Sequence, residues 1–150
     1  QTAIGQGKME VTPMHMALIT SAIANGGNLM EPYLIDSIEN YTGQKVKKYM
    51  PSSYGKLMSA QEAALLTEYM EETVLSGTAS KLKDAPYTAA GKTGTAEYTK
   101  DKSKSHAWFV GFSNKEGFPY AIVVCLENGG SGYYDAIPVA NAVLQALDED

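Results

Sequence analysis

The stretch Ala90-Gly91-Lys92-Thr93-Gly94-Thr95-Ala96-Glu97 places a cation, two hydroxyls and a glycine within four consecutive residues. If it forms a strand, Lys92 and Gly94 project to one face of the sheet, and Thr93 and Thr95 project to the other. The Lys92 ammonium then stands beside bare backbone, against which a flat anionic ligand can lie. Glycine weakens a strand, and close approach of a ligand to the backbone is one reason to retain it. The alternative interpretation is a turn, because Lys-Thr-Gly alone is a weak signal.

Length and composition indicate one globular domain. The 150 residues, of which 44% are apolar, are enough for a hydrophobic core. A formal net charge of -5 argues against a nucleic-acid surface, which needs a clustered basic excess. The single cysteine, Cys125, excludes an internal disulfide, and with two histidines it leaves no zinc pattern, so we expect no metal and no cofactor. No apolar run reaches membrane-spanning length, and Gln1 in place of Met predicts that the chain begins inside a longer protein.

Two helices are predicted in the first half of the chain. The first spans about residues 13–24, with Pro13 at the first helical position. The second spans about residues 60–76, because Ser59 and Glu62 match a capping box in which each side chain binds the backbone of the other.

Several segments are compatible with strands. Residues 33–39 and 45–50 predict a peripheral hairpin. The Lys-Thr-Gly strand is followed by two β-branched and aromatic segments, residues 106–112 and 120–126. A polar loop, residues 98–105, joins the first two of these strands, and we expect it to be mobile. The three strands then form an antiparallel meander.

The sequence ends in a third predicted helix, for which Asp135 is the expected N-cap and Pro138 is tolerated in the first turn. Its apolar stripe comprises Ala136, Val139, Ala140, Val143, Leu144 and Leu147. The predicted fold class is therefore α+β, an antiparallel β-sheet meander flanked by helices on both faces.

The motifs along the chain resemble, in content and in order, those of class B penicillin-binding proteins. The matching segments are Gly5-Gln6-Gly7, Val11 to Ala17, Ala24 to Gly27, Gly77-Thr78-Ala79, Ala90 to Glu97, His106 to Phe112 and Leu126 to Gly129. The resemblance implies a β-lactamase/transpeptidase-like fold and a bacterial D,D-transpeptidase that cross-links peptidoglycan stem peptides and is acylated by β-lactams. It also implies a location at the extracytoplasmic face of the cell membrane, anchored by an N-terminal segment outside this chain. His15 stands where the family usually has Gln, and this departure changes little.

Two motifs that the family's chemistry needs are not found in their expected form. These are S-x-x-K, which carries the serine nucleophile, and S-x-N. No S-x-N occurs, and the two strings that fit S-x-x-K are Ser53 to Lys56 and Ser80 to Lys83. We expect neither to be the nucleophile, because Gly55 interrupts the first and the second lies in a charged linker. The expectation is therefore that residues 1–150 are a single partial domain, the C-terminal portion of a transpeptidase domain. Its partner is the N-terminal half of that domain, and the chain alone is inactive.

The resemblance also implies roles for the Lys-Thr-Gly strand. Lys92 holds the terminal carboxylate of the substrate or of a β-lactam. Thr93 and Thr95 offer hydroxyls, and the backbone N–H of Thr95 is one of two oxyanion-hole donors. Gly94 keeps the strand surface flat. The alternatives are a fragment of a serine β-lactamase, a β-lactam sensor domain and a non-catalytic module that binds peptides without being acylated.

The apolar run Ala121 to Leu126 contains no proline and no charge. In the family this strand pairs on its far side with a strand that this chain lacks, so its edge is expected to be open. We therefore expect the isolated chain to form a dimer through this edge. The rival outcome is that the last helix, or the residues before Gly7, cover the edge.

Overall fold

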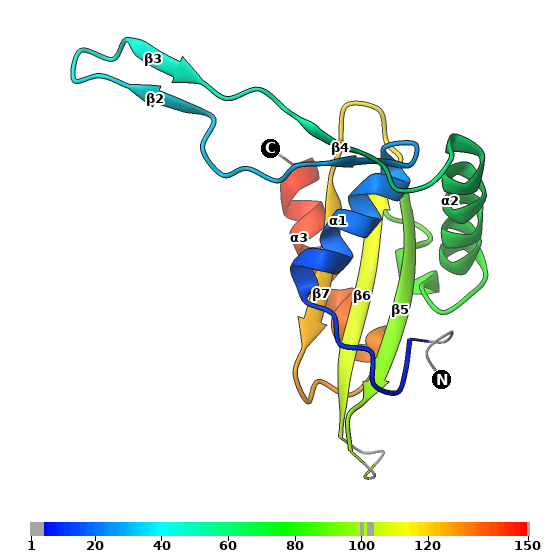
Figure 1. Cartoon of the computed structure of the whole chain (residues 1–150). Helices are drawn as coiled ribbons and strands as arrows, with labels where there is room; N and C mark the ends of the chain where they lie inside the picture. Colours follow the sequence, from blue (N-terminus) through cyan, green and yellow to red (C-terminus); the bar gives the residue numbers. More distant parts are fainter. Residues whose placement is uncertain (1–4, 100, 102–103, 150) are drawn as a thin grey trace.

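A three-stranded antiparallel sheet forms the centre of the structure (Figure 1). The computed structural model describes residues 5–99, 101 and 104–149. The strand order is β5 (Ala89–Glu97), β6 (Ser105–Ser113) and β7 (Ala121–Leu126), so the predicted meander is confirmed. The loop predicted over residues 98–105 ends one residue earlier, and its residues 100 and 102–103 lie outside the described part of the chain.

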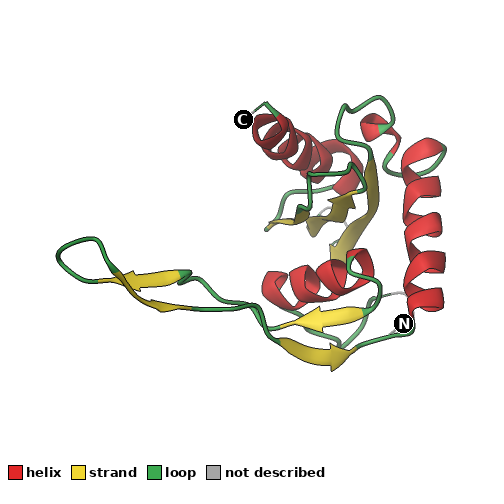
Figure 2. Cartoon of the chain, turned by 90° about the horizontal axis from the view of Figure 1, so that it is seen from above, coloured by secondary structure: helices red, strands yellow, loops and turns green. Residues whose placement is uncertain are grey.

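Helices cover both faces of this sheet, as predicted (Figures 1 and 2). On one face, α3 (Ile137–Asp148) packs against the sheet in a cluster that includes the buried Phe109 and Val124. On the other face lies α1 (Pro13–Ala24), and α2 (Ala60–Leu75) runs along the β5 side. A smaller cluster there joins Ile23 and Met70 of these two helices to the sheet.

Side chains cap the starts of α1 and α2, and the α2 cap is the predicted capping box. At α2, the Glu62 N–H donates to the Ser59 hydroxyl at 3.2 Å, and the Glu62 carboxylate accepts from the Ser59 N–H at 2.8 Å, which confirms the capping box. The bonds from the Ser59 backbone and then from its hydroxyl hold the pKa of Glu62 below its ordinary value. At α1, the N-cap Thr12 accepts from the His15 N–H at 3.2 Å, so the backbone of His15, and not its ring, completes the cap.

The prediction for Asp135 is wrong. A π-helix, η3 (Gly132–Ala136), precedes α3, so the helical backbone begins before the expected cap position. The Asp135 carboxylate reaches back and accepts from the Ser131 N–H at 2.8 Å, which satisfies the start of η3. The N-cap of α3 is Ala136, which makes no side-chain capping bond.

A long two-stranded ribbon projects from the body (Figures 1 and 2). Its outer part pairs β2 (Ser37–Glu39) with β3 (Lys45–Lys48), which confirms the predicted hairpin but shortens both strands. The sequence did not predict the inner pair, β1 (Asn28–Met30) with β4 (Ser53–Lys56). Within the described ranges, no helix is long and apolar enough to cross a bilayer.

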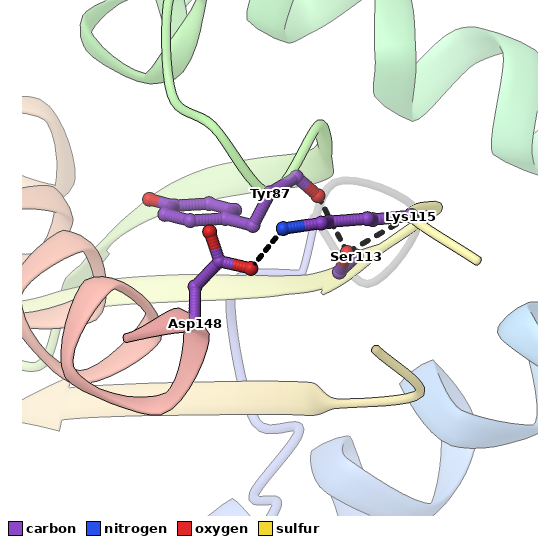
Figure 3. Close-up of polar contacts among 4 residues, drawn as sticks. All are labelled: Tyr87, Ser113, Lys115 and Asp148. Atoms are coloured by element: carbon purple, nitrogen blue, oxygen red, sulfur yellow. Dashed lines mark hydrogen bonds and ion pairs between the residues drawn. The ribbon is translucent and has the colours of Figure 1, made fainter. Parts of the chain in front are cut away.

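Polar contacts fasten one end of the sheet to α3 (Figure 3). The fully buried Tyr87 donates its O–H to the Asn141 side-chain oxygen at 2.6 Å and accepts, at its carbonyl, from the Ser113 hydroxyl. The Lys115 N–H donates to the Ser113 hydroxyl at 3.0 Å, and the Lys115 ammonium pairs with Asp148. Burial raises the pKa of Tyr87 to about 12.

Candidate functional site

The Lys-Thr-Gly strand, β5, is an edge strand, since it pairs with β6 on one side only in the described chain. Along its outer edge, every second carbonyl accepts a hydrogen bond from a side chain rather than from a strand. These bonds run from the Thr73 hydroxyl to Gly91, from the Lys92 ammonium to Thr93 at 2.8 Å, and from the Gln6 amide to Thr95 at 3.0 Å. The N–H and C=O of one residue in an antiparallel strand point to the same side, so the Thr95 N–H also faces outward.

A cleft of about 690 Å³ lies along this edge. One wall is β5 from Lys92 onward, continued by Tyr98, with the neighbouring β6 side chains His106, Trp108 and Val110. The opposite wall comes from the start of the chain and from α1, through Gly5, Gln6, Gly7, Met9, Glu10, Val11 and Met16. All four predicted site residues, Lys92, Thr93, Gly94 and Thr95, therefore line one cleft, together with the Gly-Gln-Gly segment.

Gly94 lies between two close neighbours. On the cleft side its cross-strand partner is Trp108, and a Cβ added to Gly94 would lie 3.2 Å from the Trp108 Cβ. On the rear, Gly132 at the start of η3 packs directly on the strand backbone. A Cβ added to Gly132 would lie 2.5 Å from the Trp108 carbonyl oxygen and 2.6 Å from that of Gly94. This rear support was not predicted, because nothing in the local sequence links Gly132 to the strand.

The two threonine hydroxyls differ in their surroundings. The Thr93 hydroxyl donates to the Thr78 hydroxyl at 2.7 Å, which ties β5 to the Gly77-Thr78-Ala79 loop after α2. The exposed Thr95 hydroxyl has no hydrogen-bond partner among the described residues. Of the two, Thr95 is therefore the one that a ligand can engage without displacing a protein contact.

In the described part of the chain, neither string that fits S-x-x-K has a hydrogen bond between its serine hydroxyl and its lysine ammonium. Ser53 lies in β4, where its hydroxyl donates to the Asn28 side chain at 3.1 Å, and Lys56 is three residues further along the same strand. Side chains three apart on a strand point to opposite faces. Ser80 begins a short 3-10 helix, η2 (Ser80–Leu82), rather than lying in the expected linker. In the described part of the chain, no cluster of His, Cys, Asp or Glu is arranged to hold a metal ion.

Residues 1–147 match a family model described as the penicillin binding protein transpeptidase domain. The chain belongs to the penicillin-binding protein transpeptidase family. It is 34% identical to the peptidoglycan D,D-transpeptidase PbpA of Mycobacterium tuberculosis, over 97% of this chain and 31% of that protein. It is 30% identical to the peptidoglycan D,D-transpeptidase MrdA of Haemophilus influenzae, over 94% of this chain and 24% of that protein.

Solved structures agree with the family and with the α+β fold. The ceftriaxone acyl-enzyme complex of penicillin-binding protein A from M. tuberculosis is similar, with a TM-score of 0.85 and 34% identity. The match covers 97% of this chain and 34% of that chain. The chain thus spans about a third or less of the length of these relatives.

Proposed function

We propose that this chain is the C-terminal part of a serine D,D-transpeptidase domain that cross-links peptidoglycan stem peptides and is acylated by β-lactams. The observation that carries the proposal is the open edge of β5, where Lys92, Thr93, Gly94 and Thr95 line one cleft. The family membership supports it, and so does the likeness to a protein solved as a ceftriaxone acyl-enzyme. The serine nucleophile and its base then come from a segment outside these 150 residues.

In this proposal, Lys92 attracts the carboxylate of the substrate. The Thr95 hydroxyl, three residues along β5 and on the other face of the strand, donates to a different oxygen of a ligand that lies along the strand edge. The exposed Lys92 ammonium already binds an oxygen, the Thr93 carbonyl at 2.8 Å, so its donors are held at the strand edge. A charge-assisted hydrogen bond of this kind is roughly twice as strong as a neutral one. Thr93 acts through its bond to Thr78, which holds the strand in place against the loop after α2.

The outward-facing Thr95 N–H is the proposed oxyanion donor. When a serine attacks the carbonyl carbon of the substrate, the carbonyl oxygen becomes an alkoxide, and a fixed N–H donor stabilises it. The β5–β6 ladder fixes this N–H before the reaction, so little reorganisation is needed. Removing one such donor typically lowers the rate by about a hundredfold or more. Acyl transfer of this type needs proton transfer and oxyanion stabilisation, which side chains and backbone supply without a cofactor.

We further propose that the whole protein acts at the extracytoplasmic face of the bacterial membrane, anchored by a segment outside this chain. Peptidoglycan stem peptides, its proposed substrates, lie on that side of the membrane. Residues 1–150 then form one partial domain whose remaining half packs against the open side of β5.

A fluorescent penicillin tests the proposal by denaturing electrophoresis. The 150-residue chain alone is expected to remain unlabelled, whereas the longer protein that contains it is expected to carry one label per molecule. A stoichiometric label on the chain alone, abolished by Ser53→Ala, would overturn the assignment of the nucleophile. Rapid turnover of the penicillin by the longer protein would instead indicate a β-lactamase, and the absence of any label would indicate a non-catalytic module.

A further inference from the structure

The cleft continues beyond Thr95 to a second group of side chains. Ala96 pairs with His106 across β5 and β6, and Tyr98 follows at the end of β5. Both Tyr98 and His106 line the same cleft as Lys92. Lys92 and Ala96 are four residues apart, which places His106 about 13 Å along the strand from the Lys92 position.

Tyr98, His106 and Asn128 form an interlocked cluster from three separate segments. The rings of Tyr98 and His106 stack with centroids 4.4 Å apart and planes at 9°. Asn128, in the turn after β7, binds both rings. Its backbone N–H donates to His106 Nδ1 at 3.2 Å, and its side-chain oxygen accepts from the Tyr98 O–H. Asn128 adopts a φ of +54°, a left-handed conformation that Asn tolerates better than most residues.

These contacts fix the chemistry that His106 presents. Because Nδ1 accepts a hydrogen bond, the proton of the neutral imidazole is assigned to Nε2. That Nε2–H has no hydrogen-bond partner within the described residues. The stack and the bond from Asn128 hold the ring in one orientation, so His106 offers a preorganised donor in the cleft.

The direction in which a ligand can extend is also set by the structure. At the Gly91 end of β5, the Thr73 hydroxyl of α2 occupies the outward carbonyl, and α2 packs alongside. An elongated ligand anchored at Lys92 therefore meets a packed helix toward Gly91, whereas toward Thr95 and Tyr98 it meets the Gln6 side chain, whose amide binds the Thr95 carbonyl at 3.0 Å. Over about 13 Å, it reaches His106.

We propose that Tyr98, His106 and Asn128 form a distal subsite that binds a carbonyl or carboxylate oxygen of a peptide-like acyl donor. The oxygen accepts from His106 Nε2–H, and the half-exposed Tyr98 ring packs against the adjoining part of the ligand. The subsite rests on the proposed function, since it is defined by its distance from a carboxylate at Lys92. It selects ligands by length, favouring those that carry an acceptor about 13 Å from that carboxylate.

Two penicillins test the subsite in the complete transpeptidase that contains this chain. Piperacillin carries a long acylamino chain, whereas 6-aminopenicillanic acid has none. His106→Phe keeps a ring to stack on Tyr98 but removes the donor, whereas His106→Gln restores an N–H. The measured quantity is the second-order rate constant of acylation by piperacillin divided by that of acylation by 6-aminopenicillanic acid. This ratio is expected to fall about fivefold to tenfold in His106→Phe, because the loss of one hydrogen bond weakens binding by about that factor. His106→Gln is expected to recover part of that ratio.

Asn128→Gly provides a second variant whose folding is not at risk, because glycine adopts a positive φ freely. It frees the Tyr98 hydroxyl and is expected to lower the same ratio by a smaller factor. An unchanged ratio in both His106→Phe and Asn128→Gly would overturn the subsite, whether the individual rates fall or not. Failure of the wild-type protein to react with either penicillin would refute the proposed function, and the subsite with it.

Discussion

Replacing Gly132 by alanine tests how closely the cleft strand is supported from behind. The new methyl group would lie 2.5 Å from the Trp108 carbonyl oxygen, 2.6 Å from the Gly94 carbonyl oxygen and 3.0 Å from the Gly94 nitrogen. All three atoms belong to the backbone of β5 and β6, which the ladder holds in register. Relief therefore requires η3 to move away or β5 to shift toward the cleft.

The expected loss in the free energy of unfolding is about 3 kcal/mol, the upper end of the range for overpacking, because no flexible side chain can yield. Gly117→Ala is the matched control. Gly117 has a φ of +77° with nothing within 4 Å of its added Cβ, so it reports only the backbone cost of about 1 kcal/mol. Gly94→Ala is a third variant in the comparison of unfolding free energies. Its added Cβ would lie 3.2 Å from a side-chain atom of Trp108 rather than against backbone.

Denaturant unfolding of the three variants under identical conditions gives the comparison. Gly132→Ala is expected to be the least stable, by about 2 kcal/mol relative to Gly117→Ala. If Gly132→Ala is as stable as Gly117→Ala, η3 does not press on the strand and the rear support does not exist.

Three further predictions concern stability and association. Raising the pH from 10 to 12 is expected to lower the free energy of unfolding by about 2 kcal/mol more in wild type than in Tyr87→Phe, because the unfolded phenol ionises near 10 and the folded one at about 12. If the free energy of unfolding falls equally with pH in wild type and in Tyr87→Phe, this prediction is wrong. Ser59→Ala is expected to lower the free energy of unfolding by about 1 kcal/mol through loss of the α2 cap, and thermal melting measures it. Light scattering of the 150-residue chain is expected to show concentration-dependent dimers that Val123→Lys abolishes, because β7 has a free edge in the described sheet. A monomer at all concentrations would refute it.

Much of the fold was predictable because its signals are local. The capping box of Ser59 and Glu62 and the β-branched and aromatic residues of 106–112 each act within a few residues, and the structure has the corresponding elements. The error at Asp135 has the same origin. A carboxylate near a helix start satisfies a π-helical turn as well as an α-helical one, and only the packing of η3 decides between them.

The contacts that complete the site were not predictable from local patterns. The pairing of β1 with β4 joins segments about 25 residues apart, which the hydrophobic pattern does not encode. Thr78 belongs to the Gly77-Thr78-Ala79 motif, but its bond to Thr93 depends on how α2 docks on β5. The stack of Tyr98 on His106 likewise arises from the strand register.

Acylation of a Lys92 variant tests the central claim most directly. Lys92→Ala in the complete transpeptidase is compared with Lys56→Ala, which removes an exposed lysine of β4 outside the cleft. Both variants are expected to unfold at close to the wild-type denaturant concentration, since both ammonium groups are exposed. Loss of a charge-assisted carboxylate anchor is expected to lower the rate of penicillin acylation about 10-fold to 100-fold in Lys92→Ala only. A wild-type acylation rate in folded Lys92→Ala would contradict the claim that this strand anchors the ligand.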